Sequence, residues 1–451
     1  MFPSLKSPKA LTAHTKRENK SKREMGAGPL KDQTHFLTKR LLPCVIYALL
    51  PLALFRFYFY PPSFNESLEK APQDKPIIVI KPSSKATNEK FSGIPCDYTS
   101  GKWVRDMLGP RYNGTSCTTI KDGQNCMSHG RPDLGYLYWR WKPKGCNLPR
   151  FEPSTFLRIV ENKHLAFVGD SMARNQLESL LCLLSEASPP HLVYRDGEEN
   201  KFRRWHISSH NITVSIYWSP FLVKGIEKSA SGFNHNRLYV DLVDDRWGSE
   251  MGQMDVIVLS IGHWFLHPAV YLEKDLVLGC HFCPNMNHTE IGFYQVFRKS
   301  LRTALKAISD VQDGKKRQII VTTFSPSHFE GDWDKAGACP KKMPSKEGEK
   351  AMESMDVEMR NIEIEEVEVA MKNGAQIGLQ FETLDITKLS LMRPDGHPGP
   401  YMYPFPFAHG VPERVQNDCV HWCLPGPIDT WNEILLEVMK RWEVQANRDG
   451  L

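Results

Sequence analysis

Short apolar segments alternate with longer amphipathic segments along most of the chain beyond residue 150. The short segments are continuous apolar runs bounded by turn residues, which is typical of strands covered on both faces. The longer segments repeat apolar residues at helical spacing. The pattern predicts strands at 164–169, 255–260, 318–324 and 375–382, and helices at 171–186, 290–310, 347–373 and 428–445. This alternation predicts an α/β fold in which helices flank a mostly parallel sheet.

A different apolar pattern occupies residues 41–60, where "LLPCVIYALLPLALFRFYFY" runs for twenty residues. That length matches one bilayer crossing, and Arg56 lies near enough to its far end to reach the interface. Residues 1–40 carry ten Lys and Arg against three acids. By the positive-inside rule we expect a single-pass type II signal anchor with a cytosolic basic tail. A cleaved signal peptide is the alternative, although no small-residue cleavage site follows the run.

The basic tail also explains the charge of the chain. The formal net charge is +5, and residues 1–40 contribute +7, which leaves −2 for all the rest. A nearly neutral body has no excess of cations to neutralise phosphates, so the sequence argues against a nucleic-acid-binding enzyme.

The distribution of cysteines supports a lumenal body. Cys44 falls in the predicted anchor and the other ten cysteines follow it. In an oxidising lumen an even number of cysteines predicts a disulfide framework. The Cys280-x-x-Cys283 spacing also occurs in zinc sites, but no second ligand pair with suitable spacing is evident, so we expect a disulfide and no metal. The body also has four glycosylation sequons, at Asn65, Asn113, Asn211 and Asn287.

Composition divides the lumenal part further. Residues 61–95 are rich in Pro, Ser, Lys and Glu and predict a stem. Residues 96–150 combine four cysteines with Gly, Pro, Asn and aromatic residues, which predicts a loop-rich, disulfide-linked subdomain. Residues 151–451 contain the alternating strands and helices, so we expect them to form the catalytic domain.

The stretch "AFVGDSMARNQ" places Ser171 between a predicted strand and a predicted helix. Ser is a common N-cap residue, and capping alone is a sufficient reason for a serine there. The same position suits a nucleophile, because a tight turn exposes the hydroxyl and the helix N–H groups stabilise a nearby oxyanion. Both interpretations remain open from these residues alone.

A serine nucleophile requires a base and a residue that orients that base. Near the C-terminus, "NDCVHWCLPGPIDTW" places Asp418 and His421 three residues apart, and cysteines bracket the pair. Disulfides to Cys419 and Cys423 would fix this loop and hold the carboxylate beside the imidazole. A surface loop stapled by two disulfides, without catalytic residues, is the alternative.

Together, Gly169-Asp-Ser171 and Asp418-x-x-His421 resemble the motifs of GDSL/SGNH-like esterases. The whole layout is similar to that of the plant trichome birefringence-like family of polysaccharide O-acetyltransferases. The blocks that carry this resemblance are the basic tail, anchor, stem, Cys-rich module, "GDS", "GHWF", "RPDGHPGPY" and "DCVHWCLPGPIDTWNE". The resemblance covers about residues 96–445 and implies a Golgi enzyme that acetylates cell-wall glycans.

The resemblance implies a role for several residues. Ser171 becomes acetylated, His421 acts as general base and then acid, and Asp418 is its partner. This chain has Ser260 where many members have Asn, so Gly262 N–H or Asn175 is expected to replace that contact. The residues expected to form the oxyanion and substrate site are Gly169, Asp170, Arg174, Asn175, Gly262, His263 and Trp264. The implied disulfides are Cys96–Cys146, Cys117–Cys182, Cys126–Cys423, Cys339–Cys419 and Cys280–Cys283.

Two further features are candidates for substrate contact. "RPDGHPGPY" contains a second acid–base pair, Asp395 and His397, which the resemblance assigns to an active-site rim or structural loop. Tryptophans stack on sugars when exposed, although most are core residues. The candidates are Trp139, Trp141, Trp264 and Trp422.

Three functions fit these residues. The first is an O-acetyltransferase that moves acetyl to a xyloglucan, mannan or xylan class of glycan. Its donor is acetyl-CoA or a lumenal acetyl carrier, with no tightly bound cofactor. The second is a polysaccharide acetylesterase that uses the same triad with water as acceptor, and the third is a non-catalytic glycan-binding protein. The resemblance favours the transferase, and the intact Ser, Asp and His set argues against the binding protein.

Overall fold

The computed structural model describes residues 96–196, 201–229, 232–311, 313–374 and 378–448. The expected tail (1–40), anchor (41–60), stem (61–95) and the sequon at Asn65 lie outside these residues. Among the residues described, no helix combines the length and apolar character that a bilayer crossing requires.

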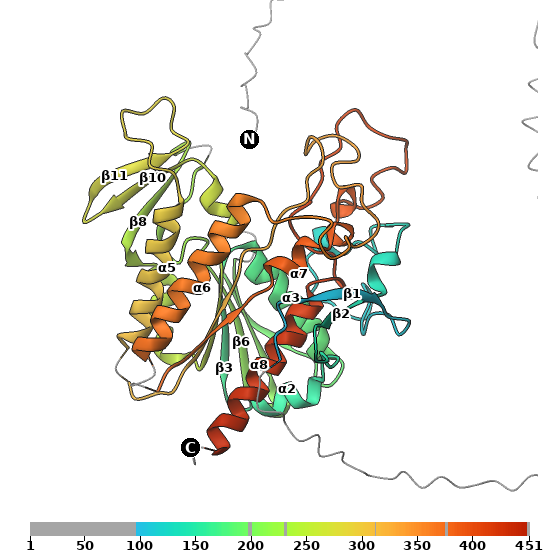
Figure 1. Cartoon of the computed structure of the whole chain (residues 1–451), viewed down its shortest axis with the longest axis horizontal. Helices are drawn as coiled ribbons and strands as arrows, with labels where there is room; N and C mark the ends of the chain where they lie inside the picture. The colour runs from blue at the N-terminus through green and yellow to red at the C-terminus, as the bar shows by residue number, and fades with distance from the viewer. Residues whose placement is uncertain (1–95, 197–200, 230–231, 312, 375–377, 449–451) are drawn as a thin grey trace, which may run out of the picture. The chain divides into compact units, whose positions relative to one another are not determined.

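A seven-stranded sheet forms the centre of the domain (Figure 1). Five strands are parallel, and an antiparallel hairpin extends one edge. The strand order is β13 (Gln380–Leu384), β12 (Gln318–Thr322), β9 (Val256–Ser260), β3 (His164–Gly169), β6 (Ile212–Trp218), β5 (Phe202–Ile207) and β4 (His191–Asp196). Because β3 and β9 pair in parallel, their carboxyl ends, where Gly169 faces Ser260, lie together at one edge of the sheet.

Both faces of the sheet are buried, as continuous apolar strands require. In β3, Leu165 and Phe167 enter one core, whereas Ala166 and Val168 enter the other. Five helices supply the two covering layers. The first core contains α2 (Pro153–Ile159), α3 (Ser171–Ser185) and α8 (Asp429–Arg448), and the second contains α5 (Tyr294–Ser309) and α6 (Ser354–Gly374) (Figure 1).

A second sheet of four strands lies against the second core. Its order is β11 (Leu276–His281), β10 (Ala269–Glu273), β8 (Asn236–Val243) and β7 (Val223–Ile226). Residues of β8 and β10, such as Leu238 and Tyr271, are fully buried in the same cluster as α5. The remaining short helices are α4 (Asp245–Gly248), α7 (Thr387–Leu391), η1 (Asp122–Gln124), η2 (Gly135–Leu137), η4 (Ser208–His210), η5 (Met251–Gln253), η6 (His263–Leu266), η8 (Pro394–Gly396) and η9 (Pro400–Met402).

The expected α/β class is confirmed, while several element boundaries differ from the prediction. The predicted helix at 347–373 begins only at Ser354, and the strand expected at 375–382 is β13, which begins at Gln380. The sequence pattern also missed β6, because "ITVSIYW" has polar residues within the apolar run, one of them at a buried position. One of them, Ser215, is 1% exposed and lies 2.8 Å from Nε2 of His164. That tertiary contact makes a polar residue acceptable inside the sheet.

Residues 96–150 form a two-stranded sheet with long loops, and side chains from it reach into the main core. The strands are β1 (Gly101–Arg105) and β2 (Trp139–Pro143). Trp103 donates from Nε1 to the Leu389 carbonyl at 2.9 Å. The five disulfides of the structure are Cys96–Cys146, Cys117–Cys182, Cys126–Cys423, Cys280–Cys283 and Cys339–Cys419, the pairs that the family resemblance implies.

Candidate active site

Ser171 is the first residue of α3, directly after the end of β3. The N-cap is its neighbour Asp170, whose Oδ1 accepts the N–H of Met172 at 2.8 Å. The serine hydroxyl is therefore not needed for capping. Ser171 is partly exposed in a region where most of α3 is buried. A hydroxyl at a helix N-terminus is well placed for an anionic intermediate, because the first N–H groups have no partner inside the helix.

A glycine precedes Asp170 because the two central strands approach closely there. A Cβ atom added to Gly169 would lie 1.8 Å from the carbonyl oxygen of Ser260. The same carbonyl accepts the N–H of Asp170 at 3.1 Å. Gly169 is thus required for packing the strand ends, and its expected place in the oxyanion and substrate site stays a prediction.

Asp418 and His421 form a directly hydrogen-bonded pair. His421 Nδ1–H donates to Asp418 Oδ2 at 2.7 Å, and Asp418 Oδ1 accepts the N–H groups of Val420 and His421. Burial alone raises the pKa of Asp418, but His421 and these N–H groups outweigh it and hold that pKa far below its usual range. Nε2 of His421 is buried and has no hydrogen-bond partner among the described residues. The ring therefore presents one unused nitrogen, in the tautomer that a general base needs.

Asn175 connects this loop to α3 one turn after Ser171. Its Oδ1 accepts the N–H of Trp422 at 2.8 Å, and its Nδ2 donates to the Trp422 carbonyl and to Gln124 Oε1. Because Trp422 follows His421, these bonds hold the imidazole near the start of α3. The amide of Asn175 is 0% exposed and bonds at both of its ends within the protein, so it braces the loop, and its expected contact with the oxyanion stays a prediction.

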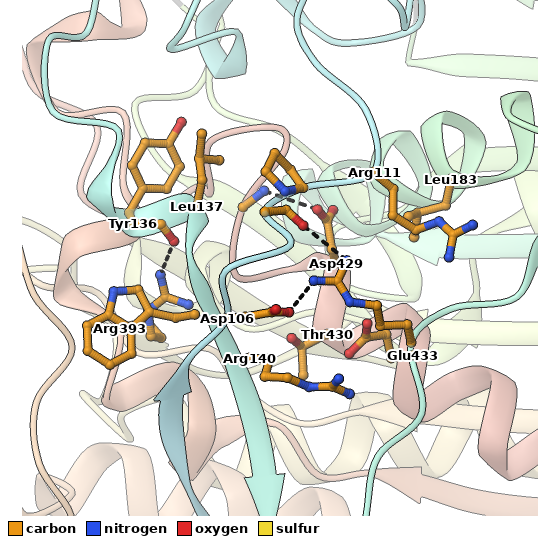
Figure 2. A pocket seen from close by; sticks show the side chains of 15 residues that line it. Asp106, Arg111, Tyr136, Leu137, Arg140, Leu183, Arg393, Asp429, Thr430 and Glu433 are labelled. Carbon is orange, nitrogen blue, oxygen red and sulfur yellow. Dashed lines mark hydrogen bonds and ion pairs between the residues drawn. The ribbon is translucent and has the colours of Figure 1, made fainter. Parts of the chain in front are cut away.

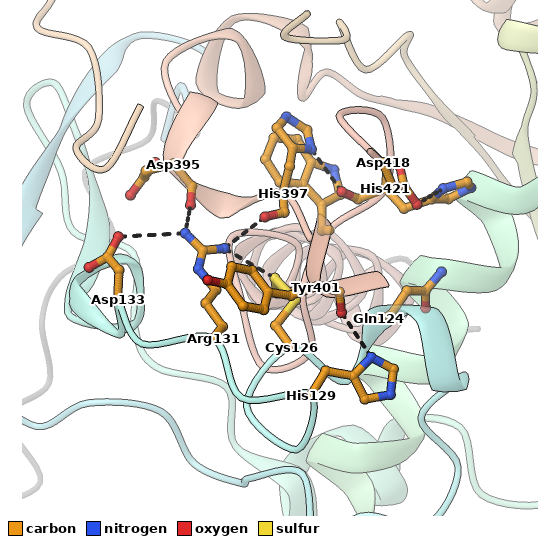
Figure 3. The surroundings of a disulfide bond; sticks show 12 residues. Gln124, Cys126, His129, Arg131, Asp133, Asp395, His397, Tyr401, Asp418 and His421 are labelled. Carbon is orange, nitrogen blue, oxygen red and sulfur yellow. Dashed lines mark hydrogen bonds and ion pairs between the residues drawn. A yellow bond between two sulfur atoms is a disulfide. The ribbon is translucent and has the colours of Figure 1, made fainter. Parts of the chain in front are cut away.

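Two disulfides brace the same loop (Figure 3). Cys419 is bonded to Cys339, and Cys423 is bonded to Cys126 in the N-terminal subdomain. Figure 3 shows Arg131 of that subdomain beside the Cys126–Cys423 bond. Its guanidinium donates to the carbonyls of Asp395 and His397 at 2.6 and 2.7 Å.

The "RPDGHPGPY" loop is structural. Asp395 is 1% exposed and forms a two-point ion pair with Arg393 at 2.8 and 3.0 Å, so it does not partner His397. His397 donates instead from Nδ1 to the carbonyl of His421 at 2.7 Å and stacks on Trp422 at 4.3 Å. The loop thus supports the backbone of the Asp418–His421 segment from behind.

The "GHWF" block forms η6 beside the end of β9. Burial lowers the pKa of His263 to about 4, and its Nε2–H donates to the Ser325 carbonyl at 2.9 Å. The Gly262 N–H faces Asp170 closely enough to lower the pKa of that carboxyl, although burial dominates and raises that pKa to about 6. Asp170 is buried and faces the Gly262 N–H, and the expected roles of both residues at the oxyanion and substrate site stay predictions.

Aromatic rings continue from η6 toward α3. Trp264 is partly exposed and packs edge-to-face on Trp218 at 5.4 Å. The guanidinium of Arg174 lies over the ring of Trp218, 5.4 Å from its centre. Of the other tryptophans considered for sugar stacking, Trp141 and Trp422 are in the core, at 1% and 0% exposure.

A cavity of about 500 Å³ reaches Arg174 from the outside. One wall is residues 118–122 of the N-terminal subdomain, and the other is formed by β4 and β5. Because Arg174 is three residues after Ser171, the two side chains are neighbours on one helix face. This cavity is therefore a substrate-sized space whose lining includes a residue one turn from Ser171.

A second cavity, of about 60 Å³, lies between the N-terminal subdomain and α8 (Figure 2). It includes Leu183, which is twelve residues along α3 from Ser171, about 18 Å at 1.5 Å per residue. Asp429 and Glu433 of α8 lie at its wall (Figure 2). Burial raises the pKa of Asp429 to about 6 and that of Glu433 to about 7. Its small volume and its distance from Ser171 separate this cavity from the chemistry.

We expect Glu433→Gln to change how stability depends on pH. The folded protein keeps a proton on Glu433 up to about pH 7, whereas the unfolded chain loses it near pH 4.5. Stability from this group therefore falls as pH rises through that window. The free energy of unfolding of the variant should match that of the wild type at pH 4.5 and exceed it by roughly 2–3 kcal/mol at pH 8. Urea unfolding at both pH values measures this difference, and a gain independent of pH would contradict the prediction.

The remaining sequence candidates are the sequons and the Cys280-x-x-Cys283 pair. Asn113, Asn211 and Asn287 are all exposed, as glycosylation requires. Cys280 and Cys283 are bonded to each other, with Glu290 nearby, so these thiols are not available as zinc ligands.

The central parallel sheet with helices on both faces is the fold class of α/β acyl esterases. The GDSL/SGNH-like acyl-esterase family found in Pmr5 and Cas1p matches residues 148–438, and the PMR5 N-terminal domain matches residues 95–147. The chain belongs to this family, in its plant trichome birefringence-like and xyloglucan O-acetyltransferase branch.

Three relatives illustrate the similarity. Xyloglucan O-acetyltransferase 1 of Populus trichocarpa is 65% identical over 92% of this chain and 96% of its own length. Xyloglucan O-acetyltransferase 1 of Arabidopsis thaliana is 55% identical over 90% of this chain and 97% of its own length. Protein trichome birefringence-like 26 of Arabidopsis thaliana is 43% identical over 80% of each chain.

Proposed function

We propose that this chain is a xyloglucan O-acetyltransferase that works through an acetyl group bound to Ser171. The observation that carries the proposal is the Asp418–His421 pair, with its buried unpartnered Nε2, tied through Asn175 to α3 one turn after Ser171. The 55–65% identity to xyloglucan O-acetyltransferases supports xyloglucan as the acceptor.

The chemistry takes two steps that use the same residues. In the first, His421 Nε2 removes the proton of the Ser171 hydroxyl, and the oxygen attacks the donor's acetyl carbonyl. The protonated His421 then gives its proton to the leaving group, and Ser171 holds the acetyl ester. In the second step, a glycan hydroxyl loses its proton to Nε2 and attacks that ester, and the proton returns to Ser171.

The surroundings of the pair serve both steps. Ionised Asp418 fixes the tautomer of His421 and stabilises the imidazolium that forms twice. The Ser171 backbone N–H and the N-terminus of α3 stabilise the oxyanion. Arg174, Trp218 and Trp264 form the floor on which donor and acceptor approach.

Location follows from the sequence and the disulfides. We propose that residues 41–60 anchor the chain in the Golgi membrane, with the catalytic domain in the lumen. Five disulfides fit an oxidising compartment. The acetyl donor is then a lumenal acetyl carrier or acetyl-CoA.

Product analysis distinguishes transfer from hydrolysis. The purified chain is incubated with acetyl-CoA or an aryl acetate and with xyloglucan, mannan or xylan oligosaccharides, and products are weighed by mass spectrometry. The proposal expects acetylated xyloglucan fragments in excess of free acetate. Release of acetate from every donor without glycan acetylation would identify an acetylesterase, and acetylated xylan or mannan alone would overturn the acceptor.

A further inference from the structure

A continuous chain of hydrogen bonds runs through two buried imidazoles to the backbone of His421. His328 Nε2 is 2.8 Å from the Leu391 carbonyl, and His328 Nδ1 is 2.7 Å from His397 Nε2. His397 Nδ1 is then 2.7 Å from the His421 carbonyl. His328 and His397 are only 3% and 4% exposed.

The atoms at the two ends of this chain determine where its protons are. A carbonyl oxygen only accepts, so the outer nitrogen of each ring must carry a hydrogen. In a neutral imidazole the inner nitrogen would then be a bare lone pair on both rings. Two lone pairs at 2.7 Å repel each other, whereas one proton between them makes a short, charge-assisted hydrogen bond.

We propose that His328 and His397 share one proton, carry a single positive charge as a pair, and act as positioning residues for His421. This inference rests on the proposed function of His421 as the general base. His397 of the pair holds the backbone of His421 through its carbonyl, while Asp418 holds the imidazole through Nδ1. A second contact reinforces the arrangement, since the backbone N–H of His328 donates to the Cys419 carbonyl at 3.0 Å.

The charges that face the pair come from several elements. Asp418 of the catalytic loop favours a proton on His397, whereas Arg131 of the N-terminal subdomain opposes it. Lys350, in the segment before α6, opposes a proton on His328. Burial acts in the same direction as these cations and lowers the pKa of both imidazoles, so it opposes the shared proton and excludes a second one. The hydrogen-bond geometry favours the shared proton, because the inner contact at 2.7 Å needs a hydrogen and both outer nitrogens face carbonyl oxygens.

Two further ion pairs lie in the loops that carry or contact His397. Arg393 and Asp395 neutralise each other in the same loop as His397. His397 contacts only the backbone carbonyl of His421. The imidazole of His421 is bonded through its Nδ1 to Asp418. Asp418 is therefore the counter-charge of the shared proton as well as the partner of His421.

The shared proton makes the position of His421 dependent on pH. While the proton is bound, all three hydrogen bonds of the chain are made. When the pair loses this proton at higher pH, two hydrogens remain for three hydrogen bonds. One bond is then lost, either to the Leu391 or His421 carbonyl or between the two rings. We therefore expect the positioning of His421 to be present at lower pH and lost as pH rises through the pKa of the pair.

Nuclear magnetic resonance tests the protonation directly and without any activity. In the purified chain with ¹⁵N-labelled histidine at pH 6, two rings should share one strongly deshielded N–H proton. In His328→Asn this signal should vanish, while the Nδ1–H signal of His421 stays. Neutral nitrogen shifts for both rings at pH 6 would overturn the proposal, whatever the enzyme's substrate is.

Kinetics test the positioning role with three variants. In His328→Asn the side-chain amide N–H takes the place of the His328 Nδ1–H and donates to Nε2 of His397. Because the amide is neutral and does not titrate, it keeps this hydrogen bond at every pH. The kcat ratio of wild type to this variant should fall as pH rises from 6 to 9. His328→Ala removes the donor and should lower kcat between about 10- and 100-fold with KM nearly unchanged. The exposed His409→Asn is the matched control and should equal the wild type.

These outcomes separate the inference from the proposed function. A His328→Asn profile parallel to that of the wild type would exclude the shared proton even if acetyl transfer is confirmed. Conversely, a chain that acetylates no glycan still reports the same kinetics through hydrolysis of an aryl acetate. Circular dichroism shows whether His328→Ala is folded. If it is not, the pH profile of His328→Asn decides whether the proton is shared.

Discussion

Ser171→Ala abolishes acetyl transfer and aryl-acetate hydrolysis while the protein stays folded. Removing the nucleophile of a Ser–His–Asp site lowers kcat by about 10⁴-fold or more, because the covalent route is closed. The substitution removes one partly exposed oxygen that does not cap α3, so the unfolding midpoint should change little. Initial rates with each donor and thermal unfolding measure the two effects.

The matched control is Ser185→Ala, at the other end of the same helix. Its hydroxyl bonds only to the carbonyl of Leu181, and it should leave kcat unchanged. Intact protein mass after a short incubation with an aryl acetate adds a second readout, since acetyl should appear on the wild type and on Ser185→Ala only. Acetylation of Ser171→Ala at the same rate would refute the assignment of the nucleophile.

Asp418→Asn should lower kcat by about 10⁴-fold with little change in the bound geometry. The amide no longer stabilises the imidazolium, and its N–H₂ group favours the wrong tautomer of His421. Because His421 and the two N–H groups stabilise the ionised carboxylate more than burial opposes it, the variant should also lose stability. The pH dependence of the residual rate and the unfolding midpoint measure both consequences.

Asp395→Asn is the informative comparison, since Asp395 belongs to the other acid–base motif of the sequence. It breaks a buried ion pair with Arg393 and should cost about 3–5 kcal/mol of stability. The fraction that remains folded should keep a kcat near that of the wild type. If instead Asp395→Asn lost kcat at full stability and Asp418→Asn did not, the assignment of the acid would be reversed.

The sequence identified the parts of the site that depend on local order. The run from β3 into α3 is visible because apolar residues, a glycine and an N-cap follow one another within a few positions. Asp418 and His421 are three residues apart, and their hydrogen bond forms within one turn of chain. Resemblance to a known family supplied the link between these two segments, because nothing in their spacing indicates that they meet.

The roles of the supporting residues depended on contacts across the chain. Asn175 was expected at the oxyanion, yet its amide bonds to Trp422, 247 residues away. His397 was expected to partner Asp395, but it contacts His328, 69 residues earlier, and the His421 carbonyl. His328 had no signal in the sequence, since one histidine among sixteen in a loop is not distinctive.

The sequence by itself determined the alternation of strands and helices, the turn that places Ser171 and the short Asp418–His421 pair. These features follow from periodicity and from bonds between near neighbours. The tertiary structure alone decided which polar atoms already have partners and that, among the described residues, Nε2 of His421 does not. The physical reason is that buried polar groups take whatever partners the packed fold brings to them, and sequence spacing does not encode those partners.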